Sequence, residues 1–391
     1  IISNDSNDKL GVNMDTKAST SRTDALQAAT SCIISIEVGK RFDLWDQDWK
    51  IPLQYGIRQV YGENGGPGGL FHSLRQIPPI IEICEDINLI CPDAVVFNFS
   101  NPMQRICHAV TTKFPDLRFI GLCHEIKSMN RQLPDLMETE MHNIEYRAAG
   151  LNHLSILIEA RYKNTGKDGY PIIKQNFDAY FSDLVNKHDA KPSKPGAERG
   201  VFRKLFKTYG YLPITTDSHL GEYIQWAYSV ADHDAILDFY DNYKEKCLAF
   251  YDNKTSYDHY FDLKNLDTHE RVVPIIEGIL SDSAYEEPAI NIPNNGYIEC
   301  LPKDIVVEVP GIINKSGISG ISFKNYPAAF GSLLNSQSGV IQMTTDAVLN
   351  ASKHSAYLAL LADPVVNDSY QAEKLLNNML ETQGKFLYYL K

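Results

Sequence analysis

Two short segments of the sequence place a thiol and an imidazole 30 positions apart, at Cys123 and His153. The first reads Gly-Leu-Cys-His-Glu-Ile over 121–126, and the second reads Gly-Leu-Asn-His over 150–153. Thiolates and imidazoles are both frequent ligands of transition metals. A Cys or a lone His is, however, more often an ordinary core residue. The pair therefore gains weight only from its place in the fold.

Length and composition limit the function classes. The chain has 391 residues, 43% apolar and 22% charged, enough for two packed units with a shared core. A net charge of −12 without a dense Lys/Arg block disfavours nucleic-acid binding. No apolar run reaches the roughly 18 residues of a membrane span, and there is no signal-peptide pattern. Seven Cys, an odd number, indicate reduced thiols, so we expect a cytoplasmic protein.

Short apolar runs alternate with helical patterns in the first third of the chain. We expect strands at 32–36, 94–99 and 118–122, and helices at 23–30, 69–90 and 102–112, the second of them bent at Pro78-Pro79. Short apolar strands joined by helices are typical of a parallel sheet. The sequence therefore predicts an α/β fold.

Three polar clusters follow the three predicted strands, at 37–39, 98–102 and 123–125. Open parallel sheets bind ligands at the carboxyl ends of their strands, so we expect the clusters to converge. The glycine-rich stretch 61–69 leads into a helix and is either a close backbone approach to a ligand or a flexible loop. Neither a P-loop nor a G-x-G-x-x-G fingerprint is present.

Further along, 146–161 reads as an irregular strand pair that carries His153. The segment 214–223 is dense in groups that can move protons, although a capped helix N-terminus is the simpler interpretation. We expect surface loops at 191–200 and 258–268.

Taken in order, these segments resemble glycoside hydrolase family 4, the NAD- and manganese-dependent glycosidases. The matching segments are Glu-Val-Gly at 37–39, Gly-Pro-Gly-Gly at 66–69, Asn-Phe-Ser-Asn-Pro-Met at 98–103, the two boxes at 121–124 and 150–153, Pro-Asn-Asn-Gly at 293–296 and Val-Val-Glu-Val at 306–309. The resemblance runs from about residue 15 to the C-terminus. As an ordered set, the motifs are highly specific.

The resemblance implies a Rossmann-type parallel-sheet domain over 1–150 and an α+β domain similar to that of lactate dehydrogenase over 151–391. It also implies a homodimer or homotetramer. Roughly the first sixty to eighty residues of the family pattern, with the strand and turn that hold the pyrophosphate, have no counterpart. Because a missing strand would expose a sheet edge, we expect the sequence to be part of a longer chain.

The resemblance implies roles for individual residues. Cys123 and His153 would bind Mn²⁺, although a thiolate alone would suggest zinc. Residues that would line NAD are Ser35, Glu37, Val38, Asn98 and Asn101. Asn101 and Asn152 would hold hydroxyls of an α-glycoside.

The mechanism implied by the resemblance is not two-carboxylate hydrolysis. A hydride passes from sugar C3 to NAD⁺, a base removes the C2 proton, the glycosidic oxygen leaves, water adds, and the ketone is reduced again. We expect Asp217 to be the base, with Tyr223 as the second choice. Phospho-sugar relatives have an acidic Asp after the Cys, where this chain has His124. His124 could be the leaving-group acid or a sugar ligand, and its presence argues against a phosphorylated substrate.

Hydrolysis of an α-glucoside or α-galactoside is the function that the resemblance favours. An α-uronidase of the same family is an alternative. The fold class alone also permits a lactate- or malate-type NAD-dependent dehydrogenase, which would have no use for Cys123 as a ligand. A non-catalytic sensor of sugar or dinucleotide is the remaining alternative.

Overall fold

The computed structural model describes residue 11 and residues 14–187, 199–252 and 271–391. Its strands are β1 (Ser31–Ile34), β2 (Val95–Asn98), β3 (Arg118–Gly121), β4 (Ile144–Leu151), β5 (Leu154–Tyr162), β6 (Tyr285–Pro293), β7 (Val306–Asn314) and β8 (Gly317–Gly320). The predicted loop at 258–268, and all but the end of that at 191–200, lie outside the described residues.

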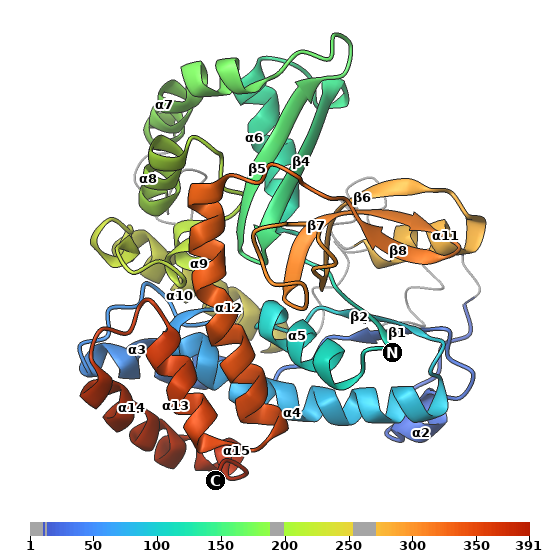
Figure 1. The fold of residues 1–391 in the computed structure, drawn as a ribbon, viewed down its shortest axis with the longest axis vertical. Coiled ribbons are helices and arrows are strands. Elements are labelled where there is room, and N and C mark those ends of the chain that lie inside the picture. Colours follow the sequence, from blue (N-terminus) through green and yellow to red (C-terminus); the bar gives the residue numbers. More distant parts are fainter. Residues whose placement is uncertain (1–10, 12–13, 188–198, 253–270) are drawn as a thin grey trace.

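Helices surround this sheet on both sides (Figure 1). They are α2 (Arg22–Ala25), α3 (Arg41–Gln54), α4 (Gly66–Ile90), α5 (Met103–Lys113), α6 (Ser128–Met137), α7 (Tyr170–Lys187), α8 (Gly200–Tyr209), α9 (Asp217–Gly221), α10 (His233–Asp252), α11 (Val272–Ser281), α12 (Ala328–Leu349), α13 (Lys353–Ala362), α14 (Ser369–Thr382) and α15 (Gly384–Leu387). Within the described ranges, none of these helices is long and apolar enough to cross a bilayer.

The three predicted N-terminal strands are confirmed as a parallel set. β1 pairs with β2 and β2 pairs with β3, each in a four-residue parallel ladder. The side chains of β2 are buried on both faces, which explains its continuous apolar sequence. Parallel strands bring their carboxyl ends to one edge, so the polar segments after β1, β2 and β3 converge there.

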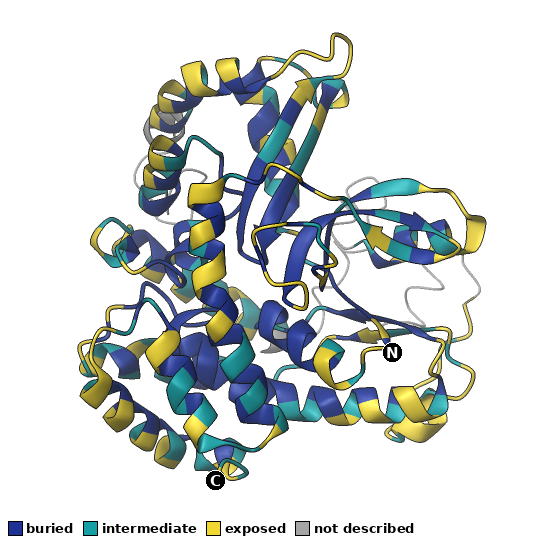
Figure 2. Cartoon of the chain, in the orientation of Figure 1, coloured by how far each residue is buried: buried dark blue, intermediate teal, exposed yellow. Residues whose placement is uncertain are grey.

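The sheet continues without a break into the second half of the chain. Its order is β1-β2-β3-β6-β7-β4-β5, with β8 beside β7. The added strands are antiparallel to their neighbours, which gives a mixed α/β fold. Position 150, the predicted domain boundary, lies within β4, so the two halves share one sheet. In Figure 2 the central strands of this sheet are among the most buried parts of the molecule.

The glycine-rich stretch enters α4 three residues earlier than predicted, with a proline in the first turn. A Cβ on Gly69 would lie 2.4 Å from the carbonyl carbon of Asn64, so only glycine fits there. Helix α4 runs through Pro78 and Pro79 as one element. Pro78 has no N–H to offer Leu74, and the carbonyl of Leu74 instead accepts a 2.7 Å hydrogen bond from Tyr389. The C-terminal segment thus compensates for the proline.

Candidate active site

Cys123 and His153 lie side by side although their strands are not neighbours. The Cys123 Sγ and His153 Nε2 atoms are 3.4 Å apart. Cys123 follows β3, and His153 occupies the turn between β4 and β5 with a left-handed backbone at φ 62°. Non-glycine residues rarely adopt that conformation, and they do so mostly where a side chain must be aimed. The structure therefore brings together the two residues that first drew attention in the sequence.

The Cys123–His153 pair fits a shared metal ion. Two ligands about 2.1–2.3 Å from one ion lie roughly 3–3.6 Å apart, which matches the observed separation. Burial raises the pKa of the Cys123 thiol and lowers that of His153, so both groups are uncharged without a cation. His153 Nδ1 is buried without a hydrogen-bond partner in the described chain. Across the described ranges, no three His, Cys, Asp or Glu side chains gather around one metal position.

A row of four residues crosses the sheet just before these ligands. Gly121 of β3 pairs with Asn291 of β6, Asn291 with Glu308 of β7, and Glu308 with Gly150 of β4. A Cβ on Gly150 would lie 2.4 Å from the carbonyl oxygen of Leu154, so the strand turns there only with glycine. This row fixes the positions from which Cys123 and His153 project.

Glu308 is a buried carboxylate with a donor for each oxygen. Ser155 Oγ donates to its Oε1 at 2.8 Å, and Asn152 Nδ2 donates to its Oε2 at 2.9 Å. The Asn291 amide adds a longer contact of 3.3 Å to Oε2. Asn152, the predicted sugar ligand, is only 1% exposed, and its side-chain amide donates a hydrogen bond to Glu308. Its structural role is to hold the turn that carries His153.

His219 is a proton-carrying group in direct contact with His153. Its ring stacks on that of His153, with centroids 4.2 Å apart and planes at 21°. Its Nδ1 lies 4.0 Å from Glu222 Oε2 and 3.4 Å from the Asn64 side-chain amide. Burial lowers the pKa of His219, but Glu222 and the nearby Glu63 carboxylate outweigh that effect and raise it to about 9.

Glu222 joins the His219 segment to the glycine-rich loop. Its carboxylate accepts hydrogen bonds from three successive backbone amides, those of Glu63, Asn64 and Gly65. These amides immediately precede the N-terminus of α4, where free N–H groups favour a negative charge. The anion at this helix end is therefore a side chain of the protein itself.

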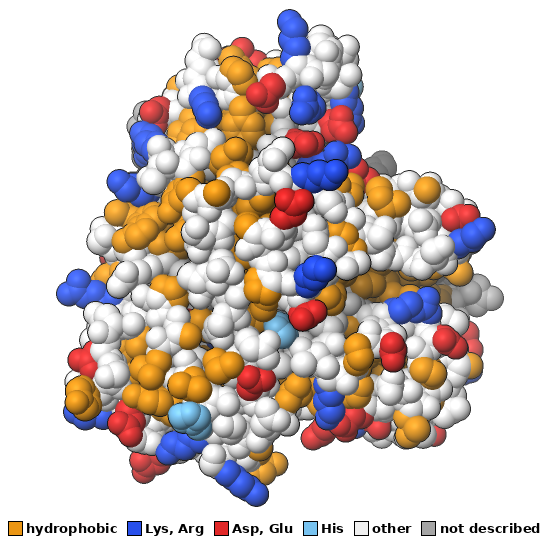
Figure 3. All heavy atoms as spheres, in the orientation of Figure 1, with side chains coloured by type: hydrophobic (Ala, Val, Ile, Leu, Met, Phe, Trp, Pro, Cys, Tyr) orange, Lys and Arg blue, Asp and Glu red, His pale blue; other side chains and the backbone are white. Residues whose placement is uncertain are grey.

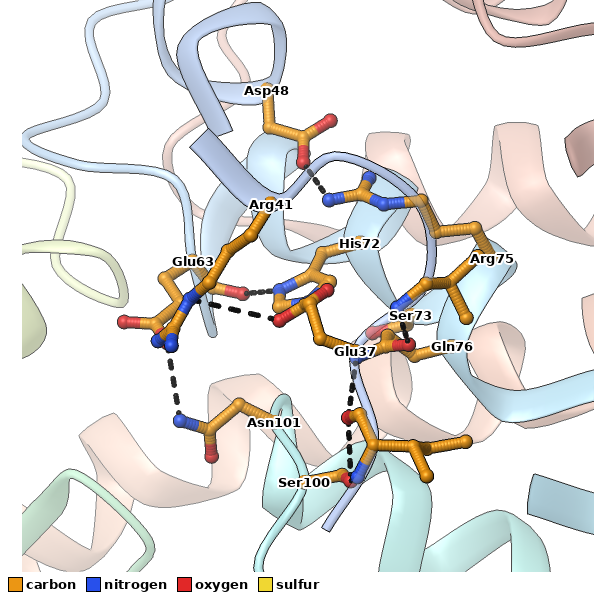
Figure 4. A network of polar contacts seen from close by, with 12 residues as sticks. Glu37, Arg41, Asp48, Glu63, His72, Ser73, Arg75, Gln76, Ser100 and Asn101 are labelled. Carbon is orange, nitrogen blue, oxygen red and sulfur yellow. Dashed lines mark hydrogen bonds and ion pairs between the residues drawn. The ribbon is translucent and has the colours of Figure 1, made fainter. Parts of the chain in front are cut away.

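A second polar network lies under the carboxyl ends of β1 and β2 (Figure 4). His72 of α4 places Nδ1 2.8 Å from the Glu63 carbonyl oxygen and Nε2 3.3 Å from Glu37 Oε1. The Asn101 amide donates to Glu63 Oε1 at 3.2 Å. Burial would raise the pKa of Glu37, but His72 and the Arg41 charge lower it below its usual range. Glu37 and Asn101, both predicted site residues, thus belong to one connected group.

The other residues predicted to line the dinucleotide differ in whether they are exposed or already hydrogen-bonded within the protein. Ser35 is exposed, and the Val38 amide donates to Gln76 Oε1 at 2.9 Å. Asn98 is fully buried, where its side chain makes hydrogen bonds of 2.9 and 3.3 Å to the backbone of Ser100. Asn98 therefore shapes the turn that presents Asn101.

The two predicted bases lie in less open positions. The Asp217 carboxylate accepts the Val201 and Phe202 amides, each at 2.9 Å, at the start of α8. Burial raises the pKa of Asp217 despite these donors. The Tyr223 ring packs against Gly65, where an added Cβ would lie 2.7 Å from it. In the described chain, neither residue makes a hydrogen bond or ring contact with Cys123 or His153.

Sequence reasoning singled out the segment 214–223 and weighed Asp217 and Tyr223, but it assigned no role to His219. Asp217 caps α8, whereas the ring of His219, two positions further on, stacks on the ring of His153. The signal that could have found His219 is helical spacing, because His219 and Glu222 are three residues apart and so share one face. Glu308 lies in the matching segment 306–309 and Glu63 in the glycine-rich stretch, but no local pattern gave either side chain a role. The partners of Glu308, Asn152 and Ser155, come from a distant part of the sequence.

A parallel Rossmann-type sheet extended by an antiparallel second half, with a thiol–imidazole pair at their junction, defines an α/β enzyme of the dinucleotide-binding class. Residues 1–139 match the description "Family 4 glycosyl hydrolase", and 148–366 match "Family 4 glycosyl hydrolase C-terminal domain". The chain therefore belongs to glycoside hydrolase family 4 and is a glycoside hydrolase.

Individual relatives agree with that assignment. The chain is 46% identical to an α-glucosidase of Erwinia rhapontici, over 96% of this chain and 86% of the relative. It is 30% identical to an α-galactosidase of Bacillus subtilis, over 87% and 77%. A solved 6-phospho-β-glucosidase from Thermotoga maritima with manganese, NAD⁺ and glucose-6-phosphate shares the fold, with a TM-score of 0.76 and 22% identity over 98% of this chain and 88% of that one. Membership of the family sets aside the dehydrogenase and sensor alternatives.

Proposed function

We propose that this enzyme hydrolyses α-glucosides with NAD and Mn²⁺ as cofactors, by oxidation at C3, elimination, addition and reduction. The observation that carries the proposal is the 3.4 Å approach of Cys123 to His153 at the carboxyl ends of the parallel strands. The α-glucosidase relative at 46% identity supports glucose as the sugar, with galactose and galacturonate as the alternatives. Family structures solved with manganese and NAD support the cofactors.

Cys123 and His153 would hold the metal. The hydrogen bonds of Glu308 to Ser155, Asn152 and Asn291 would fix the positions of these two side chains. When bound, NAD would accept and return a hydride, and Mn²⁺ would polarise substrate hydroxyls. Ser35, Glu37 and Val38 follow the end of β1 and would line the dinucleotide, and Asn101 would contact both it and the sugar. Asn98 contributes by shaping the Asn101 turn.

His219 is our choice for the group that takes the C2 proton, on geometry. Its Nδ1 faces Glu222, so Nε2 is the atom left to receive a proton from substrate. Because its carboxylate neighbours raise the pKa of His219 to about 9, the role requires that the charge of a metal held by Cys123 and His153 lower that pKa again, so that the neutral imidazole is present. Asp217 already accepts two backbone amides and Tyr223 is packed under the glycine loop, which suits them to positioning. The earlier prediction of Asp217, with Tyr223 second, remains to be tested beside it.

His124 is the proposed leaving-group acid. It is exposed and directly follows Cys123. We also propose the division into 1–150 and 151–391 as cofactor and substrate units, a homodimer or homotetramer, and a cytoplasmic location. On the face seen in Figure 3, cations and carboxylates are interspersed, and we expect no nucleic-acid partner.

Isotope labelling tests the proposed mechanism. Hydrolysis in D₂O should place deuterium at C2 of the product, because the C2 proton passes to a side chain that exchanges with solvent. Substrate deuterated at C2 or C3 should turn over more slowly if either bond cleavage limits the rate. A hydrolase working through an oxocarbenium ion breaks neither bond. Product without deuterium at C2, together with no isotope effect, would contradict the mechanism.

A further inference from the structure

The ladder between β3 and β6 is unusually short. In the described chain, the two strands pair at Gly121 and Asn291 and nowhere else. Continued towards the amino end of β3, this antiparallel register would place Phe119 opposite Pro293, which has no N–H to donate. The Phe119 amide instead donates to the Leu117 carbonyl oxygen at 2.8 Å. The pairing therefore stops, and the two strand ends are free to part.

A cavity of about 670 Å³ lies between these two strand ends. Its walls include Arg118, Phe119 and Ile120 of β3, Ile292 and Pro293 of β6, and parts of α5, α11 and β8. It opens at the amino ends of the parallel strands, whereas the proposed active site lies at their carboxyl ends. Its volume falls within the range of about 300–1,000 Å³ typical of small-molecule sites.

The walls of this cavity are mostly apolar. They include the buried ring of Phe119 and the half-buried side chains of Tyr297 and Ile318. The two charged side chains that reach it, Arg118 and Asp304, are exposed and have opposite signs. The interior therefore attracts neither an anion nor a cation. It suits an uncharged ligand, and the two aromatic rings favour an aromatic one.

His108 of α5 brings a buried polar group to the cavity. It is only 1% exposed, and its Nε2 has no hydrogen-bond partner in the described chain. Burial lowers the pKa of His108 to about 4, so the imidazole is uncharged at neutral pH. Its Nδ1 lies 3.0 Å from Thr112 Oγ1, so we assign the single ring proton to Nδ1, where it has an acceptor. Nε2 is then an acceptor without a donor, which is costly in a buried position.

We propose that this cavity is a second ligand site, for an uncharged aromatic molecule with one N–H or O–H group that donates to His108 Nε2. Indoles and phenols have this composition. The ring of the ligand would pack against Phe119 and Tyr297, and its donor would supply the partner that the imidazole lacks. Because none of the residues proposed to hold metal, dinucleotide or sugar lines the cavity, the inference does not depend on the proposed function.

The test uses two bicyclic probes of nearly the same shape. Indole carries an N–H group, whereas benzofuran has an oxygen in that position and no donor. Isothermal titration of the intact protein should show that indole binds about three- to tenfold more tightly than benzofuran, the effect of one neutral hydrogen bond. His108→Phe keeps a ring and removes both nitrogens, so the preference should disappear while benzofuran still binds.

A second pair of variants tests the location. Ile318→Trp places a larger side chain in the cavity from β8 and should weaken the binding of both probes at least about tenfold. Ile158→Trp is the matched control, at a half-buried isoleucine of β5 outside the cavity, and should leave both affinities as they are. Turnover without probe should be the same in Ile318→Trp as in the wild type.

Several results would overturn the inference. They are a Kd for indole above about 1 mM, equal affinity for the two probes, and tighter binding of benzofuran. A preference for indole that survives in His108→Phe would show that the imidazole is not the acceptor. Affinities that Ile318→Trp leaves unchanged, or that Ile158→Trp lowers as much, would show that the probes bind elsewhere.

Discussion

Two polar clusters at the centre of the sheet differ in whether all their hydrogen-bonding atoms have partners within the protein. The closed cluster is Glu308 with Ser155, Asn152 and Asn291, where both carboxylate oxygens have donors. The open cluster is Cys123, His153 and His219, where His153 Nδ1 has no partner in the described chain. Polar side chains whose atoms all have hydrogen-bond partners hold the backbone in place. Polar side chains that lie together and have unpaired atoms are available to bind a metal or a substrate.

The largest effect should come from the open cluster. Cys123→Ala and His153→Ala each remove one of two metal ligands, so turnover should become undetectable. Mn²⁺ affinity, measured by electron paramagnetic resonance of free Mn²⁺, should fall by more than the roughly 10–100-fold that follows loss of an outer-shell partner. Cys84→Ala, at a buried thiol in α4, is the control. Tight Mn²⁺ binding in both ligand variants would show that the metal lies elsewhere.

His219→Gln should lower kcat by about 10²–10⁴-fold while Mn²⁺ and NAD affinities change little. Asp217→Asn should mainly destabilise the fold, because it weakens the carboxylate that caps α8. Steady-state kinetics and thermal unfolding of both variants separate the two roles. If Asp217→Asn lost kcat with an unchanged Tm while His219→Gln stayed active, Asp217 would be the base.

The closed cluster predicts a smaller and different response. Glu308→Gln places an amide against three donors, which should cost about 1–3 kcal/mol of unfolding free energy. Because Glu308 holds the His153 turn, Mn²⁺ affinity should also fall, by about 10–100-fold. Urea unfolding and Mn²⁺ titration measure the two effects. Glu299→Gln, at an exposed position in a loop, is the control. A Glu308→Gln variant with the wild-type stability and Mn²⁺ affinity would show that this cluster does not hold the His153 turn in place.

His108 tests whether a buried polar atom without a hydrogen-bond partner is by itself enough to indicate a functional residue. It is 1% exposed, its Nδ1 lies 3.0 Å from Thr112 Oγ1, and its Nε2 has no partner in the described chain. Burial lowers the pKa of His108 to about 4. The unfolded chain therefore binds the proton first, so stability is complete above about pH 6.5 and falls as the pH drops towards 4, by about 3 kcal/mol at most.

Urea unfolding between pH 4 and 7 should show that slope for the wild type and a reduced slope for His108→Gln. His142→Gln, at an exposed histidine, should leave the slope as it is. Activity at neutral pH should not depend on His108. A loss of turnover in His108→Gln at full stability would mean that an isolated buried imidazole also carries chemistry.

Local sequence predicted the elements better than it predicted their roles. The parallel strands were found because burial on both faces requires continuous apolar runs. Cys123 and His153 were found because each follows a strand with a glycine-bearing box. Asn152 and Asn98 make hydrogen bonds within the protein, and their predicted ligand roles stay predictions. The contacts of Asn152 with Glu308 and of His219 with Asn64 join residues more than 150 positions apart, which no local pattern contains.

The row from Gly121 through Asn291 and Glu308 to Gly150 has a mechanical consequence. β3 and β4 are three strand spacings apart, about 14 Å, yet the side chains that follow them meet. A metal held there would act as a clamp across the seam between the two halves of the sheet. By mass action, its binding would add to the free energy needed to open that seam, and a chelator would release it. Amide hydrogen exchange along this row would then report metal occupancy, without any substrate being present.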